Sequence, residues 1–168
     1  RMDADDLMTE DKLKLMVEAC KEDRVVTGYV KYFSDHILGE GFIKYQDWLN
    51  RLIDTNSHYQ SMYKECVLPS PCWMTTRTTF EKCGAFNTEV YPEDYDLTFR
   101  FYKHRVEVVG IPRILHHWRD YSTRTSRTHS HYSDNSFLEL KVNYFLELDY
   151  LAEGTLIVWG AGKKGKQL

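Results

Sequence analysis

Hydrophobic positions along the first third of the chain alternate between helical and extended patterns. Thr9 is suited to cap a helix, and the apolar positions after it recur at helical spacing: Leu13, Met16, Val17 and Cys20. Residues 25–33 are a β-branched and aromatic run, which predicts a strand. A second helix is expected next, with an apolar face formed by Trp48, Leu49, Leu52 and Ile53.

The middle of the chain repeats this alternation. Residues 68–71 contain two prolines and mark a turn, and residues 72–76 then have the composition of a strand. Residues 78–82 suit a short helix that ends at the following glycine. From Asp94 the pattern is helical again, and residues 106–111 return to strand character before the next proline.

The last part of the chain is less regular. Residues 121–135 are polar, hydroxyl-rich and basic, which predicts a long surface loop that serves as a lid or binding loop or is disordered. Residues 137–150 resume helical spacing. Residues 156–159 form an apolar strand pattern that runs into GAGKKG, a match to GxGxxG. This indicates either the first strand and turn of a Rossmann-like segment or an ordinary glycine turn between a strand and a helix.

Because strands and helices alternate, we expect an α/β fold with a mixed, mainly parallel sheet and flanking helices. The 168 residues are 42% hydrophobic and 28% charged, a balance that suits one core. The 25 acidic and 22 basic residues give a net charge of -3, which argues against a nucleic-acid-binding surface.

Composition also bears on location. No run approaches the roughly 20 apolar residues of a membrane-spanning helix. The four cysteines form no CxxC pair and no zinc-finger spacing, which favours reduced thiols in a cytoplasmic protein. Peripheral contact with the inner face of the membrane stays open.

The first candidate site is the acidic motif DADD at residues 3–6. If Met2 ends a strand, Asp3 and Asp5 project to the same face two residues apart. Two such carboxylates suit Mg²⁺ or Mn²⁺, which can neutralise the charge of a diphosphate leaving group. The alternative is an acidic loop whose charges favour the N-terminus of the helix that follows.

The second candidate site is PEDYDL at residues 92–97. Three acids at a predicted helix start are explained by capping and by the helix dipole, and Asp96 fits that explanation. A general base is the sharper alternative, since a carboxylate can remove the proton of an attacking hydroxyl. A helix N-terminus lowers the pKa of a carboxylate, so burial would have to offset this effect in a base.

The third candidate site is LHHWR at residues 115–119, followed by Arg124, Ser126 and Arg127. Arginine and histidine bind phosphate oxygens, and tryptophan stacks on sugars. Two adjacent histidines on a strand cannot face the same way, so at most one of them serves a ligand. The pair His129 and His131 could hold a metal only if that segment were a strand.

In this order and at these separations, the three segments resemble family 2 glycosyltransferases of the GT-A fold. That family joins a DxD-type motif to a segment like FEKCGAFN (residues 80–87), an ED motif followed by DLxxR (93–100) and a strand leading into a histidine- and arginine-containing loop. The resemblance spans about residues 2 to 127. The tail IVWGAGKKG is similar to the segment behind such a domain in the β-1,3-N-acetylglucosaminyltransferase-like protein of vertebrates and its bacterial relatives.

The resemblance implies an inverting enzyme that moves a sugar from a nucleoside-diphosphate sugar to a hydroxyl of a sugar or glycan acceptor. The implied cofactor is Mg²⁺ or Mn²⁺, with Asp3 near the ribose or the metal and Asp5 on the metal. Asp94 is the implied general base, and Glu93 lies near the acceptor.

The same resemblance assigns the end of the third segment to the ligand. His117, Trp118 and Arg119 are expected at the pyrophosphate or at the acceptor side of the site. A retaining reaction is disfavoured by the resemblance alone and not by the chemistry of these residues.

The chain departs from the family at its beginning. The family's opening strands and nucleoside pocket precede the DxD motif, and here only Arg1 and Met2 do. We therefore expect a partial GT-A fold: residues 1–134 as the acceptor-side half, 135–152 as a C-terminal helix and 153–168 as the start of a truncated Rossmann-like segment. Such a piece is expected to be nearly inactive alone and to self-associate through an exposed sheet edge or apolar face.

Two rival functions remain. One is a binding or scaffold module of the same fold without catalysis. The other is a nucleotide-dependent oxidoreductase, which requires roughly 30 residues of βαβ structure around the terminal GxGxxG.

Overall fold

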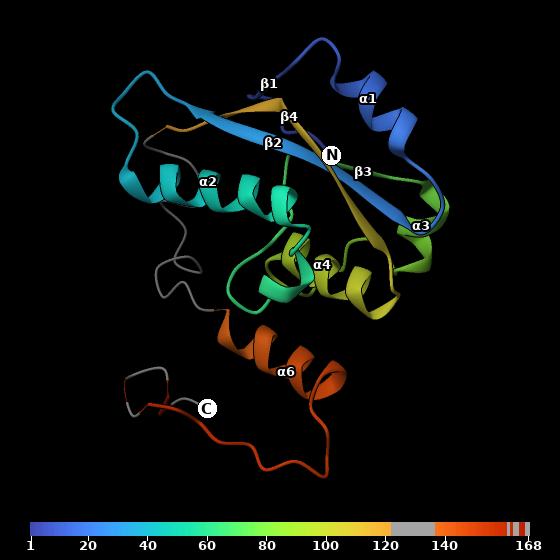
Figure 1. The fold of residues 1–168 in the computed structure, drawn as a ribbon, viewed down its shortest axis with the longest axis vertical. Coiled ribbons are helices and arrows are strands. Elements are labelled where there is room, and N and C mark those ends of the chain that lie inside the picture. Colours follow the sequence, from blue (N-terminus) through green and yellow to red (C-terminus); the bar gives the residue numbers. More distant parts are fainter. Residues whose placement is uncertain (122–136, 161, 163–164, 167–168) are drawn as a thin grey trace.

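A four-stranded mixed sheet lies at the centre of the computed structural model, which describes residues 1–121, 137–160, 162 and 165–166 (Figure 1). The strands lie in the order β1 (Leu7–Met8), β4 (Glu107–Arg119), β2 (Arg24–Phe33) and β3 (Trp73–Thr75). The central pair, β2 and β4, is parallel, and both edge strands pair antiparallel. The mixed α/β prediction is confirmed, and its parallel part is the long central pairing.

Helices flank the sheet. They are α1 (Lys12–Ala19), α2 (Glu40–Thr55), α3 (Arg77–Lys82), α4 (Glu93–Lys103) and α6 (Leu138–Leu148), with a 3-10 turn at Tyr59–Ser61. In Figure 1, α1 lies above the sheet and α2 and α4 lie below it, while α6 lies beyond α4. The sheet is therefore covered by helices on both sides.

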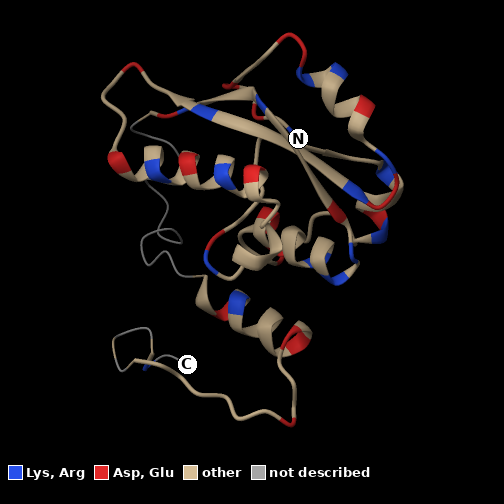
Figure 2. Ribbon diagram, viewed as in Figure 1, with Lys and Arg blue, Asp and Glu red and all other residues tan. Residues whose placement is uncertain are grey.

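The core forms where α2 packs on the two parallel strands. Leu49 and Leu52 of α2 are buried against this face, and Val26 and Val30 of β2 are fully buried. A Cβ at Gly28 would lie 2.5 Å from the side chain of Leu115, so this close approach of β2 and β4 requires glycine. The outer face of α2 is polar, and Figure 2 shows acidic and basic residues alternating along it: Glu40, Lys44, Asp47, Arg51 and Asp54.

The first helix was predicted, but its start and buried face differ from the prediction. It begins after Asp11 and not at Thr9, whose backbone N–H donates to the carbonyl of Leu115 in β4 at 3.2 Å. Leu13 and Val17, which were expected to face the core, are 51% and 61% exposed, whereas Lys12 and Met16 are buried. The helical spacing was predicted correctly, but the face that is buried includes Lys12.

Strand β4 runs beyond the point where its sequence predicts an end. The register against β2 moves from Gly28–Ile111 to Tyr29–Ile114, so Pro112 and Arg113 occupy an irregularity. A proline lacks the N–H that a ladder needs, and this irregularity lets the strand pass it. Strand pairing then continues to Arg119.

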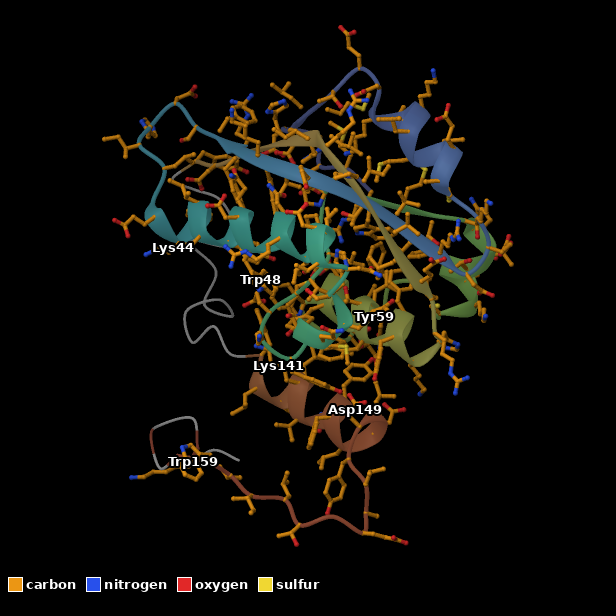
Figure 3. The ribbon with its side chains drawn as sticks, viewed as in Figure 1. Lys44, Trp48, Tyr59, Lys141, Asp149 and Trp159 are labelled. Carbon is orange, nitrogen blue, oxygen red and sulfur yellow. The ribbon has the colours of Figure 1, made fainter. Side chains whose placement is uncertain are left out.

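The C-terminal helix α6 docks on α4 and on the 59–65 segment. Tyr144 stacks on Phe99 with ring centroids 4.6 Å apart, and the Asp149 carboxylate accepts hydrogen bonds from Tyr63 at 2.5 Å and Tyr102 at 2.9 Å. Beyond α6, the expected strand at residues 156–159 is absent, since those residues have no regular secondary structure. Figure 3 shows Trp159 on this tail, apart from the core, with 98% of its surface exposed.

Candidate functional site

A cleft of about 780 Å³ lies at the edge of the sheet where the parallel strands β2 and β4 both end. Its walls come from the N-terminal turn, the end of β2, the start of α2, residues 65–70, the start of α4 and the end of β4. Ligands of α/β proteins typically bind at this carboxyl edge. Six of the seven predicted site residues line the cleft: Asp3, Asp5, Glu93, Asp94, Trp118 and Arg119.

The acidic motif near the start of the chain forms a turn and not a strand end. The first strand begins at Leu7, and Met2 does not end a strand, so the condition under which Asp3 and Asp5 would share the face of a strand is not met. Both side chains nevertheless line the cleft. The third acid, Asp6, is buried and accepts a hydrogen bond from the backbone N–H of Arg119 at 2.7 Å. This bond fastens the turn to the end of β4.

Asp6 belongs to a buried polar chain with His116 and Lys12. The Asp6 carboxylate lies 2.8 Å from Nε2 of His116, and Nδ1 of the same ring lies 3.0 Å from Nζ of Lys12. Nζ also donates to the carbonyl of Pro71 at 3.2 Å. An ammonium only donates, so with Lys12 charged, Nδ1 accepts and the Nε2–H donates to Asp6. Burial lowers the pKa of Lys12, and the carboxylates of Asp6 and Asp3 act in the opposite direction.

Helix α4 begins at the cleft with two predicted residues. The carboxylate of Glu93 forms an ion pair with the guanidinium of Arg1 at 3.0 Å, and its side chain is about one third exposed. Asp94 accepts a hydrogen bond from the N–H of Tyr95 at 2.9 Å. Both carboxylates line the cleft together with Ser70, which lies in the turn predicted at residues 68–71.

The surroundings of Asp94 shift its pKa in the direction that a general base requires. Desolvation raises the pKa of Asp94, and the neighbouring charge of Glu93 raises it further. A hydrogen bond from Ser70, the charge of Arg1 and the N–H of Tyr95 act in the opposite direction without cancelling this rise. A carboxylate with a raised pKa is a stronger base than a free one.

Asp96, in the first turn of α4, has different surroundings from Glu93 and Asp94. It is buried, and its carboxylate accepts from Nε and from a terminal nitrogen of Arg100 at 2.9 and 2.6 Å. Its other oxygen accepts from the hydroxyl of Tyr144 at 2.6 Å, and Arg100 also donates to the carbonyl of Cys83. Asp96 therefore holds α3, α4 and α6 together, which differs from the expected capping role.

Aromatic rings form one wall of the cleft. The indole of Trp118 stacks on Tyr32 with centroids 4.9 Å apart and planes 11° apart, and Phe42 meets Tyr32 edge-on at 5.3 Å. Trp118, Tyr32 and Phe42 all line the cleft. Trp118 and Tyr32 are 6% and 4% exposed and Phe42 is half-buried, so this wall offers a small apolar area of the kind that can pack against the C–H face of a sugar.

Arg119 connects this wall to the acidic turn. Its Nε donates to the carbonyl of Asp5 at 2.8 Å, and its guanidinium lies over the ring of Phe33 at 4.5 Å from the centroid. The strand end thus positions both a tryptophan and an arginine at the cleft.

His117 is the predicted residue that the described structure does not bring to the cleft. It pairs in register with Leu7 of β1 and Lys31 of β2, and its side chain is half-buried. Since neighbouring residues of a strand alternate in direction, Trp118 takes the position at the cleft. The residue before His117, His116, is the histidine that lies in the core. The predicted loop residues Arg124, Ser126, Arg127, His129 and His131 lie outside the described residues.

The residues present fit a hard divalent cation only in part. Asp3 and Asp5 supply carboxylate oxygens at the cleft, but within the described ranges no group of three or more histidine, cysteine, aspartate or glutamate side chains could hold a metal. Mg²⁺ commonly binds through one or two carboxylates and takes its remaining ligands from water and substrate phosphates. Asp3 and Asp5 fit that mode.

Several lining residues were not found by sequence reasoning: Asp6, Tyr32, Phe42, Glu65 and Ser70. Asp6 carried a usable signal as the third acid of its motif. The other four sit in segments without a recognisable motif, and only the packing of α2 and the 65–70 segment on the sheet brings them here.

Comparison with protein-family models, curated proteins and solved structures finds no match to this chain. Among the described helices, none has the length and hydrophobicity needed to span a bilayer. All four cysteines are free thiols.

Proposed function

We propose that the protein to which this chain belongs is an inverting glycosyltransferase that moves a sugar from a nucleoside diphosphate to an acceptor hydroxyl. The observation that carries this proposal is the convergence of three motifs on one cleft. Asp3 and Asp5, Glu93 and Asp94, and Trp118 and Arg119 come from three remote segments of the sequence. The partial GT-A fold is part of the same proposal, supported by the mixed sheet and by a cleft at its carboxyl edge.

In this proposal Asp94 is the general base. The acceptor oxygen bonds to the anomeric carbon as the bond from that carbon to the diphosphate breaks. The electron pair leaves with the nucleoside diphosphate, and the acceptor proton passes to Asp94. The raised pKa of Asp94, caused first by burial, suits this role because the conjugate acid then holds the proton more firmly.

The remaining residues bind and orient. Asp3 and Asp5 would hold Mg²⁺ or Mn²⁺, which neutralises charge on the leaving diphosphate. Glu93, paired with Arg1, accepts a hydrogen bond from the acceptor, and Trp118 packs against a sugar ring. Arg119 supplies guanidinium donors for phosphate oxygens.

A binding or scaffold module is the alternative, because the same cleft could hold a ligand without turnover. Calorimetry separates the two, since an enzyme of this type binds nucleoside diphosphates more tightly when Mn²⁺ is present. A scaffold module would show no such metal dependence.

Self-association and a cytoplasmic location, at or near the inner face of the membrane, stay predictions. The exposed apolar side chains of Leu7, Met8, Leu13 and Val17 on β1 and α1 support self-association.

Donor turnover tests the proposal. The full protein containing this chain is incubated with a panel of nucleoside-diphosphate sugars and Mn²⁺, and release of nucleoside diphosphate is followed. Asp5→Asn should lower the rate about 100-fold or more, because a metal contributes several kcal/mol to charge stabilisation. Asp47→Asn, on the exposed face of α2 outside the cleft, is the matched control. Turnover that survives Asp5→Asn, or no turnover with any donor, would contradict the proposal.

A further inference from the structure

The described residues of the cleft carry an excess of negative charge. Among these lining residues, six are acidic and two are basic: Asp3, Asp5, Asp6, Glu65, Glu93 and Asp94 against Arg1 and Arg119. Three of the acids, Glu65, Glu93 and Asp94, come from α4 and the 65–70 segment, and Glu93 is paired with Arg1 of the N-terminal segment. A metal bound between Asp3 and Asp5 would leave the charge of this second side in place.

The two arginines are already engaged. Arg1 is paired with Glu93 at 3.0 Å, and Arg119 donates to the carbonyl of Asp5 and lies over Phe33. Among the described residues, Glu65 accepts a hydrogen bond only from the backbone N–H of Cys66, at 2.9 Å. Asp94 forms no ion pair with any described residue. The α4 side of the cleft therefore offers carboxylates rather than cations to a ligand.

The chemistry of these groups selects among saccharides. An ionised carboxylate accepts hydrogen bonds and donates none, so it suits the hydroxyl donors of an uncharged sugar. Half-buried Phe42 adds an apolar surface for the C–H groups of the ring, and Tyr32 and Trp118, which are 4% and 6% exposed, add only a small area. A carboxylate, sulfate or phosphate on the ligand would lie against like charge in a partly desolvated cleft, which is unfavourable.

We propose that the acceptor bound in this cleft is an uncharged saccharide and that the α4 side, chiefly through Glu65 and Asp94, excludes acidic saccharides. This inference rests on the proposed function, because it identifies the cleft as the acceptor site. It adds the chemical class of the acceptor, which the three sequence motifs do not specify.

Paired oligosaccharides test the inference. Neutral tetrasaccharides of several linkages, such as β-1,4-glucan and β-1,4-galactan, are each compared with the same molecule oxidised at C6 to the uronate. Binding to the chain is followed by NMR chemical-shift titration at low salt. The best neutral ligand should bind at least about tenfold more tightly than its uronate partner, since several like charges act together. Added salt should narrow the difference.

Glu65→Gln sharpens the test, because it removes one charge from the α4 side and leaves Glu93 and Asp94 in place. The ratio of neutral to uronate affinity should fall about fivefold, which corresponds to the ~1 kcal/mol of one like-charge contact at 4 Å in water. Glu18→Gln, on the exposed face of α1 and outside the cleft, should leave the ratio unchanged.

Equal or tighter binding of the uronates, or equal ratios in the two variants, would overturn the inference. If donor turnover is present and acidic acceptors serve as well as neutral ones, the inference fails while the proposed function stands. If no tetrasaccharide binds, the inference fails because the cleft does not bind a saccharide acceptor. The donor assay with Asp5→Asn then still tests the proposed function separately.

Discussion

Two acidic clusters meet at the cleft, and each divides its three carboxylates in the same way. In the N-terminal turn all three acids line the cleft, but Asp6 is buried against His116 whereas Asp3 and Asp5 are not buried. At the start of α4, Glu93 and Asp94 line the cleft while Asp96 is also buried.

The clusters differ in how the buried member is satisfied. Asp96 is matched by the full charge of Arg100, with the hydroxyl of Tyr144 as a further donor. Asp6 is matched by a backbone N–H and by an imidazole that Lys12 orients. A dense run of acids therefore combines residues that hold the fold with residues that face a ligand, and their role is decided by burial and partners.

Removing the charge of Asp96 should have the largest effect on stability. Asp96→Asn leaves Arg100 largely buried without its carboxylate, so the free energy of unfolding should fall by about 3–5 kcal/mol. Urea unfolding followed by circular dichroism measures this change. Asp35→Asn, in the exposed segment before α2, is the control and should stay within about 0.5 kcal/mol of wild type. A small loss at Asp96 would show that the pair does not hold the helices together.

The equivalent change in the N-terminal turn should cost less. Asp6→Asn keeps the shape and an accepting oxygen, so it weakens the hydrogen bonds from Arg119 and His116 without removing both, and the free energy of unfolding should fall by about 1.5–3 kcal/mol, the worth of one hydrogen bond to a charged group. The same unfolding measurement applies. We also expect weaker Mn²⁺ binding, since the turn that presents Asp3 and Asp5 loses its anchor. Unchanged stability and unchanged Mn²⁺ affinity would mean that Asp6 does not position the turn.

Part of this organisation could be predicted from sequence. The run at residues 25–33 and the apolar face around Leu49 and Leu52 are local signals, and both elements are confirmed. The site motifs could also be found, because Asp94 and Trp118 lie in short segments of unusual composition. Their meeting at one cleft follows from the parallel pairing of β2 and β4.

The rest depends on tertiary contacts that leave no local trace. Whether His116 or His117 is buried is decided by the register against β2, which shifts near Pro112. Lys12 enters the core because His116 and the carbonyl of Pro71 receive its ammonium. The cleft position of Tyr32 likewise depends on the stacking of Trp118 from a strand far along the chain.

Asp94→Asn is expected to have the smallest effect on stability. It also tests the account most directly. Because its pKa in the fold is raised, ionisation of Asp94 costs stability as the pH rises through that pKa. Asp94→Asn should therefore leave the free energy of unfolding unchanged or slightly higher at neutral pH, and the gain should shrink as the pH falls below the pKa of Asp94.

The decisive measurement is the rate of sugar transfer by Asp94→Asn in the full protein, read together with its free energy of unfolding at neutral pH. The account predicts a rate lower by about 10²–10⁴-fold, the contribution of a general base, in a protein at least as stable as wild type. Retained transfer, or a loss of stability as large as that of Asp96→Asn, would contradict the role of Asp94 as the base of this cleft.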